Sequence, residues 1–412
     1  MLQDYTDNHQ AFINSCFYNL TLFALIFGVM FYDIIGAFGF SYVDEICALL
    51  LLLLYSYKVF VSKTWNFDRI FLTVIGVFLF YLVYSIAISS NTYGAIVTDF
   101  IIQLKPYLSF FCVYALRPVF SDNQKTIIRQ VVVLCSFFVF IVGIAALINK
   151  GTLVYSFGHQ SRLATASSIL ALLYLYCSRY TKKDILVFVL ILAIGLMSTR
   201  SKHIGFFVIG TLLTFYFNRA IKLKLNFKNV FFIVAALALT LLATWEKIYF
   251  YFVTGGFGTG RAADDMYARV ALYYFASIIL MDYIPFGSGF ASYATYTSGE
   301  SYSTIYAKYG MENMYGLTKY HPAFISDTYY PVLAQFGFAG IVLFFCFWFT
   351  LFKRAVGNYA KGFYKESVIA ILIILFFIIE CTSDSTLTHN RGMFMMMLLG
   401  LSFADVKRSF KI

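Results

Sequence analysis

Six basic residues and one histidine are placed where they could bind an anion. They stand apart from the basic runs of the chain, and they are Lys105, Arg162, Arg200, Arg261, Arg269, Arg391 and His321. Arginine binds phosphate oxygens through two parallel hydrogen bonds, and histidine both binds phosphate and accepts protons near neutral pH. These residue types predict a site for a phosphate-bearing ligand.

Three of the cations stand in or beside apolar runs. Arg200 belongs to a tight turn at residues 198–203, and Arg162 stands where an apolar run begins. An anionic ligand would retain both, but side chains that reach for lipid headgroups would give the same pattern. Lys105 lies inside an apolar run, where a charge is costly and marks a functional candidate, with Asp99 as its structural partner otherwise.

Two more candidates lie in the longest polar stretch. Arg261, Asp265 and Arg269 fall four residues apart and share one face of a predicted helix, so a salt bridge to Asp265 is the structural alternative for Arg269. His321 precedes Pro322, and a proline at a first helical position predicts that a second helix begins there. His321 would then stand at a helix start, as a proton acceptor, a phosphate ligand or a structural residue.

A short segment near the carboxyl end gathers four ionisable residues. They are Glu380, Asp384, His389 and Arg391, where the carboxylates could be proton acceptors or partners for arginines. The chain has no Gly-rich nucleotide loop, no Asp-x-Asp on a basic connection and no paired metal-ligand spacing. We therefore expect chemistry without a metal or another cofactor.

The elements that position these residues are membrane helices. Of 412 residues 61% are hydrophobic and 12% are charged, against roughly 25% charged in soluble domains. Most apolar runs exceed the roughly 18 residues that mark a spanning helix. We predict an all-α, polytopic fold of about twelve spans in a single membrane domain, residues 1–412, with one long loop at 246–329. The predicted spans are 16–35, 43–62, 70–89, 96–116, 127–148, 163–178, 184–199, 203–218, 229–245, 330–352, 367–381 and 392–405.

The basic residues predict the orientation of these spans. Alternate connections and the tail carry 20 of the 31 lysines and arginines. The positive-inside rule assigns that face to the cytoplasm, so both termini are cytoplasmic and the long loop faces outward. The net charge of +11 is then a topology and anionic-lipid signal, and we expect no nucleic-acid partner.

The long loop has a pattern of its own. Tyr267–Met281 predicts a helix, and Pro285 with the glycines after it predicts the turn that ends this helix. Residues 291–320 are rich in Tyr, Ser, Thr and Gly. That composition predicts either a surface on which sugars stack or an ordinary solvated loop.

Three short motifs follow one another in the second half of the chain: Thr199-Arg200-Ser201 at a tight turn, Arg269 followed by Pro285-Phe286-Gly287-Ser288-Gly289, and His321 followed by Phe336-Gly337-Phe338-Ala339-Gly340. In their order around a late, long loop, and in its predicted topology along the whole length, the chain resembles the O-antigen polymerase and O-antigen ligase superfamily. These are bacterial membrane glycosyltransferases that use undecaprenyl-diphosphate-linked glycans. The family's Ser-Arg pair is reversed here, and its His-Asn pair is His-Pro.

The resemblance implies a function and roles for the matched residues. Arg200 and Arg269 would bind the donor diphosphate, and His321 would assist the acceptor or the donor, which makes His321 and Arg269 the expected catalytic residues. Placement alone adds Arg162, Lys105, Arg391 and Arg261 as further substrate-binding residues. The expected activity is polymerisation of lipid-linked repeat units into O-antigen, capsule or exopolysaccharide at the periplasmic face of a bacterial inner membrane. Membrane lipid is an expected partner, and the resemblance admits a chain-length regulator protein as another.

Two other functions fit parts of the pattern. A ligase that moves the glycan onto lipid A core differs from the polymerase in its acceptor and shares its donor. A lipid-linked oligosaccharide flippase also has about twelve spans, but it would show repeated halves and charges along the centre of the bundle. Here the long loop has no counterpart in the first half.

Overall fold

The computed structural model describes residues 2–36, 42–62, 69–149, 151–218, 249 and 267–409, and its regular elements there are all helical. The first half contains α1 (Leu2–Phe23), η1 (Ala24–Met30), α2 (Tyr32–Gly36), α3 (Val43–Ser62), α4 (Arg69–Ala87), α5 (Tyr93–Leu116), α6 (Asp122–Ile148), α7 (Gly151–Phe157), α8 (Gln160–Cys177), α9 (Lys182–Ile194), η2 (Gly195–Ser198) and α10 (Ser201–Tyr216). The second half contains α12 (Ala268–Asp282), α13 (Tyr296–Glu300), α14 (Thr304–Lys308), η5 (Met311–Asn313), η6 (Tyr330–Phe336), α15 (Gly337–Ala360), α16 (Tyr364–Glu380), η7 (Thr386–Thr388) and α17 (Asn390–Ser409).

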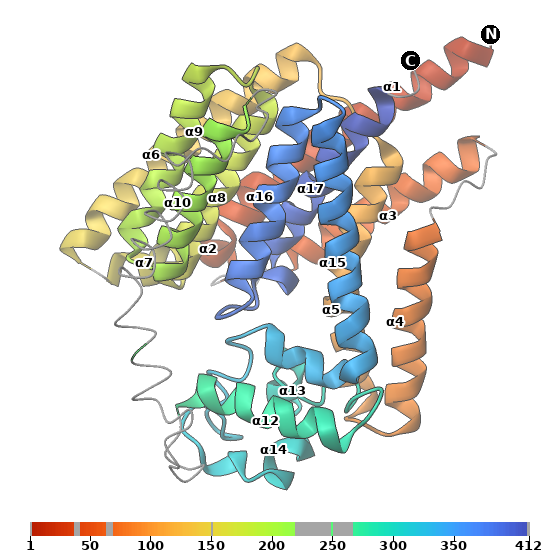
Figure 1. Cartoon of the computed structure of the whole chain (residues 1–412), viewed down its shortest axis with the longest axis vertical. Helices are drawn as coiled ribbons and strands as arrows, with labels where there is room; N and C mark the ends of the chain where they lie inside the picture. Colours follow the sequence, from red (N-terminus) through yellow and green to blue (C-terminus); the bar gives the residue numbers. More distant parts are fainter. Residues whose placement is uncertain are drawn as a thin grey trace.

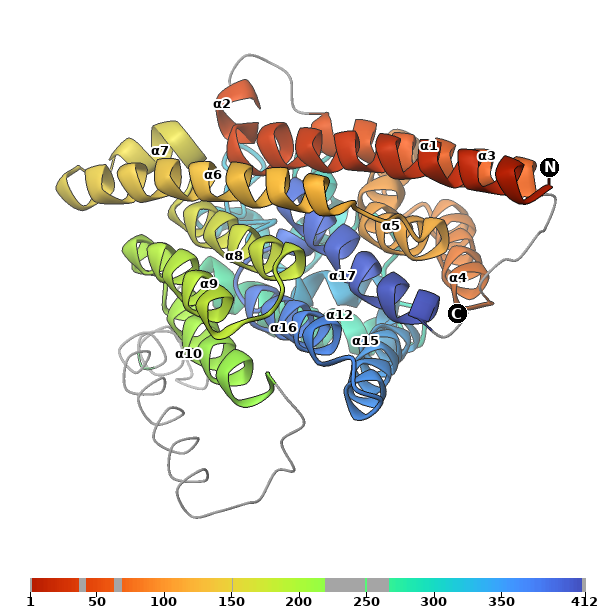
Figure 2. The ribbon, with the colours of Figure 1, turned by 90° about the horizontal axis from the view of Figure 1, so that it is seen from above.

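Six stretches are long and apolar enough to cross a membrane, by length and composition. They are Asn8–Met30, Val43–Ser62, Arg69–Ala87, Tyr93–Leu116, Asp122–Ile148 and Tyr330–Ala360. The shorter helices α8, α9, α10, α16 and α17 run beside them in one bundle (Figures 1 and 2). The all-α prediction is confirmed for the described residues, while the predicted count of twelve spans stays a prediction. The predicted span 229–245 lies outside the described residues.

The centre of the bundle is formed by helices that are apolar on every side. α17 packs against α5, α8 and α16, and Figure 2 shows it ringed by other helices. Nearly every residue of α8 from Leu163 to Cys177 is buried. A helix that is hydrophobic all round is expected in such a position. The outer helices α3, α4 and α6 instead expose large apolar side chains such as Leu72 and Phe137, as contact with lipid requires.

Residues 267–329 form a compact loop module at one end of the bundle (Figure 1). The predicted helix at Tyr267–Met281 is confirmed as α12. The module is fixed to the turn between α4 and α5, where the Asn91 side-chain amide donates to the carbonyls of Ala291 and Ser301 at 2.7 Å each. The Ala291 amide in turn donates to the Asp99 carboxylate at 2.7 Å. Because these backbone groups are buried, such partners are needed to satisfy them.

Gly287 and Gly337 let two backbones cross where the module meets α15. Both have positive φ angles, of 80° and 61°. A Cβ at Gly287 would overlap the backbone of Gly337, and a Cβ at Gly337 would overlap that of Gly287. Only glycine fits both the conformation and the space. The Gly-rich motif therefore sets how the loop module is docked.

Candidate functional site

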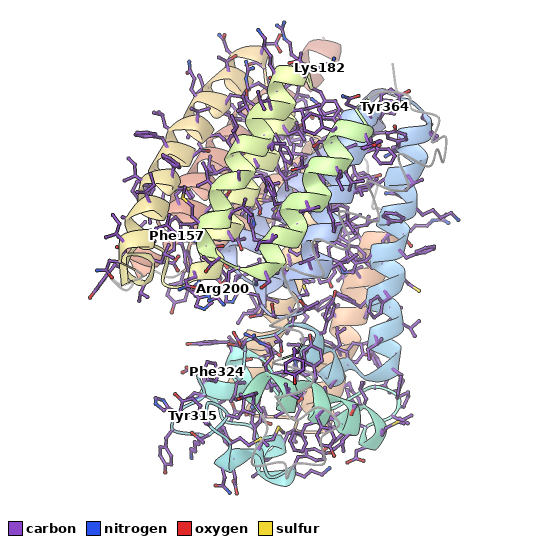
Figure 3. The ribbon with its side chains drawn as sticks, turned by 60° about the vertical axis from the view of Figure 1, so that its left-hand side comes forward. Phe157, Lys182, Arg200, Tyr315, Phe324 and Tyr364 are labelled. Atoms are coloured by element: carbon purple, nitrogen blue, oxygen red, sulfur yellow. The ribbon has the colours of Figure 1, made fainter. Side chains whose placement is uncertain are left out.

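Ionisable side chains from eight parts of the chain meet where the bundle faces the loop module. We call this set the junction cluster, and its members are Asp33, Asp44, Glu45, Lys105, His159, Arg162, Arg200, Lys202, Arg269, Asp327, Glu380, Asp384, His389 and Arg391. Figure 3 shows Arg200 at the end of the bundle, facing the side of the loop module that carries Phe324. Five of the cations predicted from sequence thus lie in one cluster, and Arg261 lies outside the described residues.

Asp33 holds two of the predicted arginines. It accepts from Arg391 at 2.8 Å and also pairs with Arg162. Arg391 is 3% exposed and also donates to the Val29 carbonyl at 2.9 Å, while the Arg162 side chain is 41% exposed. Arg391 is therefore a buried structural cation and not the surface ligand that we predicted. Arg162 keeps a face that a ligand could reach.

Lys105 pairs with two carboxylates at the start of α3. Its ammonium donates to Glu45 at 2.6 Å and to Asp44, and its side chain is 4% exposed. The predicted partner Asp99 is elsewhere, with its carboxylate bound to the Ala291 amide. The prediction that Lys105 binds substrate directly is not supported by this placement, because two carboxylates already surround its ammonium.

Lys202 forms a second buried ion-pair group. Its ammonium lies 2.5 Å from Glu380 and 3.2 Å from Asp384. Burial alone would raise the pKa of Asp384, but Lys202, His389 and hydrogen bonds from Ser161 and Thr386 outweigh it, so that pKa falls below its ordinary value. Asp384 therefore stays ionised, and its oxygens are already occupied by Ser161, Lys202 and Thr386. Its role here is to fix the groups that donate to it.

A chain of hydrogen bonds connects Arg200 to Asp384. The Arg200 guanidinium lies 3.0 Å from His159 Nε2, His159 Nδ1 lies 2.7 Å from Ser161 Oγ, and that hydroxyl donates to Asp384 at 2.9 Å. Since Arg200 can only donate, Nε2 accepts from it, and a neutral imidazole then carries its proton on Nδ1; the Ser161 amide, 3.4 Å from Nδ1, is too distant to compete for that position. Burial, and then the nearby Arg200, lower the pKa of His159 and so favour this neutral form.

Arg200 is the cluster's most available cation. Arg162, Arg269, Arg391, Lys105 and Lys202 all have carboxylate partners. Among the described residues Arg200 forms no ion pair, and its Nε has no hydrogen-bond partner. A guanidinium that is held by a neutral imidazole retains its full charge for an anion.

His389 is the exposed titratable group at the centre of the cluster. Its Nε2 lies 3.3 Å from Ser385 Oγ, and that hydroxyl donates to the carbonyl of Ser326 in the loop module at 2.6 Å. Because the serine hydrogen is already used, Nε2 must be the donor, which leaves Nδ1 as an unprotonated acceptor. Partial burial of the ring, and then Arg162 and other cations, lower the pKa of His389 below its ordinary value, although Asp384 acts in the opposite sense.

Arg269 projects toward the cluster from the first turn of α12. It pairs with Asp327 of the same loop module. The alternative partner predicted from the sequence, Asp265, lies outside the described residues. Its side chain is 25% exposed. Burial raises the pKa of Asp327 above its ordinary value, Arg269 opposes this, and Asp384 and Lys202 also lie close enough to act on it. This coupling places the Arg269 pair beside the bundle part of the cluster.

His321 lies elsewhere, and the prediction that it opens a helix is wrong. Its amide donates to the Thr318 carbonyl at 3.1 Å and to the Thr318 hydroxyl at 2.9 Å, so the chain forms a tight turn there. The next helical element, η6, begins eight residues after Pro322, with Pro331 in its first turn. His321 is exposed and forms no described ion pair. The sequence singled out one histidine of the second half, and the structure favours the other, His389.

The tyrosine-rich stretch is only partly a surface. Tyr293 and Tyr306 are fully buried in the loop module, and the Tyr306 hydroxyl receives the Ala294 amide at 2.9 Å. Tyr315 and Tyr320 are 79% and 93% exposed. The predicted sugar-stacking surface therefore excludes Tyr293 and Tyr306. It stays a prediction for the exposed rings near Phe324.

The cluster offers three properties to a ligand. It has an available guanidinium, two partly exposed arginines in exchangeable ion pairs, and a neutral imidazole with a free lone pair. These are suited to holding an anion and removing a proton beside it. Among the described residues no group of three or more His, Cys, Asp or Glu side chains is arranged to hold a metal ion.

Comparison with known proteins does not assign the chain to a family. No protein-family model matches it, and no curated protein matches it significantly.

Proposed function

We propose that this protein is a membrane glycosyltransferase that polymerises undecaprenyl-diphosphate-linked oligosaccharide repeat units into O-antigen, capsule or exopolysaccharide. The observation that carries the proposal is that Arg162, Arg200, Arg269 and the exposed His389 belong to one cluster, where the apolar bundle meets the loop module. A lipid-linked diphosphate carries its charge at the membrane surface. It would therefore meet the protein at this level.

The proposed topology has twelve spans with both termini in the cytoplasm of a bacterium. Residues 246–329 are then periplasmic, and the junction cluster lies at the outer face of the inner membrane. This agrees with the basic connections of the sequence, which gather at the other end of the spans.

The proposed reaction is a displacement at the anomeric carbon of the donor. The acceptor hydroxyl oxygen forms the new bond to that carbon, and the bond from the carbon to the diphosphate oxygen breaks. Undecaprenyl diphosphate leaves with the electron pair, and His389 Nδ1 takes the hydroxyl proton. His389 combines exposure with an unprotonated ring nitrogen that no described hydrogen bond occupies, whereas Nε2 of the exposed His159 already accepts from Arg200.

Arginines stabilise the leaving group in this scheme. Arg200 is held by His159 and needs no new conformation to face a phosphate. Arg162 and Arg269 exchange their carboxylates for phosphate oxygens, and Asp33 then keeps its buried partner Arg391. Preorganised donors of this kind are worth most where charge develops in the transition state.

The test is turnover by purified protein in lipid vesicles that contain a lipid-linked repeat unit. Release of undecaprenyl diphosphate with a ladder of longer glycans would support the polymerase. Release only after lipid A core is added would identify the ligase, and a longer ladder with an added chain-length regulator would identify that partner. Transbilayer movement of the donor without release would contradict a transferase and identify a flippase.

A further inference from the structure

A cavity of about 240 Å³ lies between α4 and α15, away from the junction cluster. One side is formed by the α4 residues Thr73 and Val77, and the other by Leu343 and Phe344 of α15. Thr73 and Leu343 are exposed, so the cavity opens onto the outer surface of the bundle. Both helices belong to stretches that are long and apolar enough to span a bilayer, so hydrocarbon lies against this opening.

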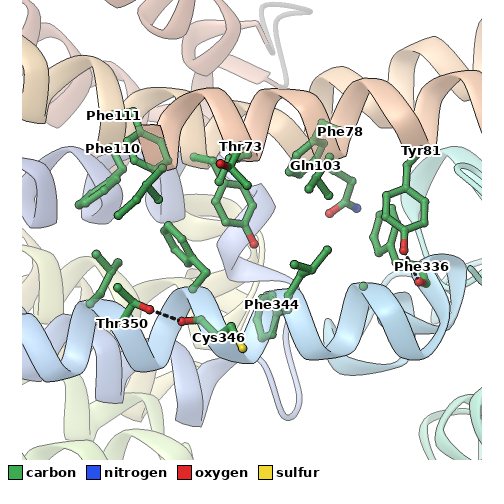
Figure 4. Close-up of a pocket in the computed structure, with 18 of the residues that line it drawn as sticks. Thr73, Phe78, Tyr81, Gln103, Phe110, Phe111, Phe336, Phe344, Cys346 and Thr350 are labelled. Atoms are coloured by element: carbon green, nitrogen blue, oxygen red, sulfur yellow. Dashed lines mark hydrogen bonds between the residues drawn. The ribbon is translucent and has the colours of Figure 1, made fainter. Parts of the chain in front are cut away.

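The floor of the cavity is sealed by aromatic rings. Phe347 of α15 packs against Tyr107 and Phe110 of α5, with ring centroids 5.1 Å and 6.1 Å apart. Figure 4 shows Phe110 and Phe111 behind the gap between the two helices. A lining of this kind has few hydrogen bonds to offer water, so an apolar chain is the favourable occupant.

The two ends of the cavity differ. At the end near the loop module, the Tyr81 hydroxyl donates to the Phe336 carbonyl at 2.6 Å and the two rings lie 5.1 Å apart, which closes that end (Figure 4). At the opposite end the lining includes Arg354, and Arg69 begins α4 one residue before the lining residue Ile70. Neither arginine forms an ion pair within the described residues.

We propose that this cavity binds one hydrocarbon chain of an anionic phospholipid, with the phosphate at Arg354 and Arg69. The closed end rules out entry from the junction cluster, so the bound lipid has its head at the far surface and cannot be the lipid-linked donor. Along α15 the cavity extends from Gly340 to Arg354, about 21 Å at 1.5 Å per residue, which suits an extended chain. This site does not depend on the proposed function.

The test is native mass spectrometry of the full-length protein, titrated with phosphatidylglycerol or with phosphatidylethanolamine of the same chains. We expect one tightly retained phosphatidylglycerol. Arg354→Gln should weaken its retention about tenfold, because charge-assisted hydrogen bonds are lost. Lys353→Gln, the neighbouring exposed lysine outside the lining, is the matched control and should change retention less than twofold.

A second pair of variants tests the chain position. Thr73→Trp fills the cavity and should abolish retention of both phospholipids, whereas Leu72→Trp on the exposed side of α4 should not. Equal retention in all four variants would overturn the proposal. Retention of undecaprenyl diphosphate in place of phospholipid would also overturn it, since that head belongs at the other end.

Discussion

Replacing His389 with glutamine tests the proton-transfer step directly. Glutamine can still donate to Ser385, as His389 Nε2 does, but it has no basic nitrogen to take a proton. Loss of a positioned general base costs typically 10²- to 10⁴-fold in rate. We therefore expect kcat to fall by at least about 100-fold, while KM for the donor changes less than about threefold because no phosphate ligand is lost.

The pH profile gives an independent readout of the same group. Neutral imidazole is the active form, so kcat/KM, which reports the free protein, should fall as the pH drops through the pKa of His389. Because partial burial and the nearby cations lower that pKa, the rate should stay level from neutral pH to well below pH 6.5. An unperturbed histidine would instead give a limb near pH 6.5. The limb should be absent from the residual activity of His389→Gln.

His321→Gln is the matched control, because His321 is exposed and lies outside the junction cluster. The assay is release of undecaprenyl diphosphate under single-turnover conditions, with folding checked by thermal unfolding. Full activity of His389→Gln together with loss of activity in His321→Gln would refute the assignment and restore the role that the family resemblance implies for His321.

Two stability predictions follow from the packing. Asp33→Asn leaves the buried Arg391 without a counter-charge and should lower the free energy of unfolding by about 3 kcal/mol. Asp122→Asn changes an exposed carboxylate and should lower it little. Equal melting temperatures of the two variants would contradict the ion-pair account. Gly287→Ala should largely abolish the folded yield, because its Cβ would overlap backbone, while Gly310→Ala should cost only about 1 kcal/mol, since its φ of 71° is similar but its surroundings are open. Comparable yields of the two glycine variants would show that the backbone crossing is not needed.

Much of the fold could be predicted because single helices are encoded locally. The apolar runs placed most described helices, and Tyr267–Met281 matches α12 closely. The helical element before α15 was predicted to begin at Pro322, but η6 begins at Tyr330. The prediction failed because Pro322 and Pro331 both satisfy the rule for a proline in the first helical turn. Only the hydrogen bonds of the Thr318 turn exclude the earlier one.

The site was predictable in its cations and not in their partners. Arg162, Arg200 and Arg269 stood out because they lie away from the basic runs of the alternate connections, which is a one-dimensional signal. The pairing of Lys105 with Asp44 and Glu45 spans about 60 residues and depends on how α3 packs on α5. No spacing rule gives such a contact.

The sequence did mark the segment that contains His389, but the family motifs favoured His321 as the catalytic histidine. His389 stood with Glu380, Asp384 and Arg391 in one short segment, and the local density of ionisable residues beside apolar helices marked that segment. What sequence could not supply is the environment that keeps its imidazole neutral and exposed beside several cations.

The central claim is that the junction cluster binds the donor diphosphate through Arg200. Its most direct test is kcat/KM for release of undecaprenyl diphosphate by Arg200→Gln beside Lys308→Gln. Lys308 is another cationic residue of the loop module, on α14 at the side away from the bundle, where it lies 4.6 Å from the Tyr283 ring (Figure 1). The account predicts a loss of about tenfold to 100-fold for Arg200→Gln and nearly wild-type activity for Lys308→Gln. Equal activity of the two variants would contradict it.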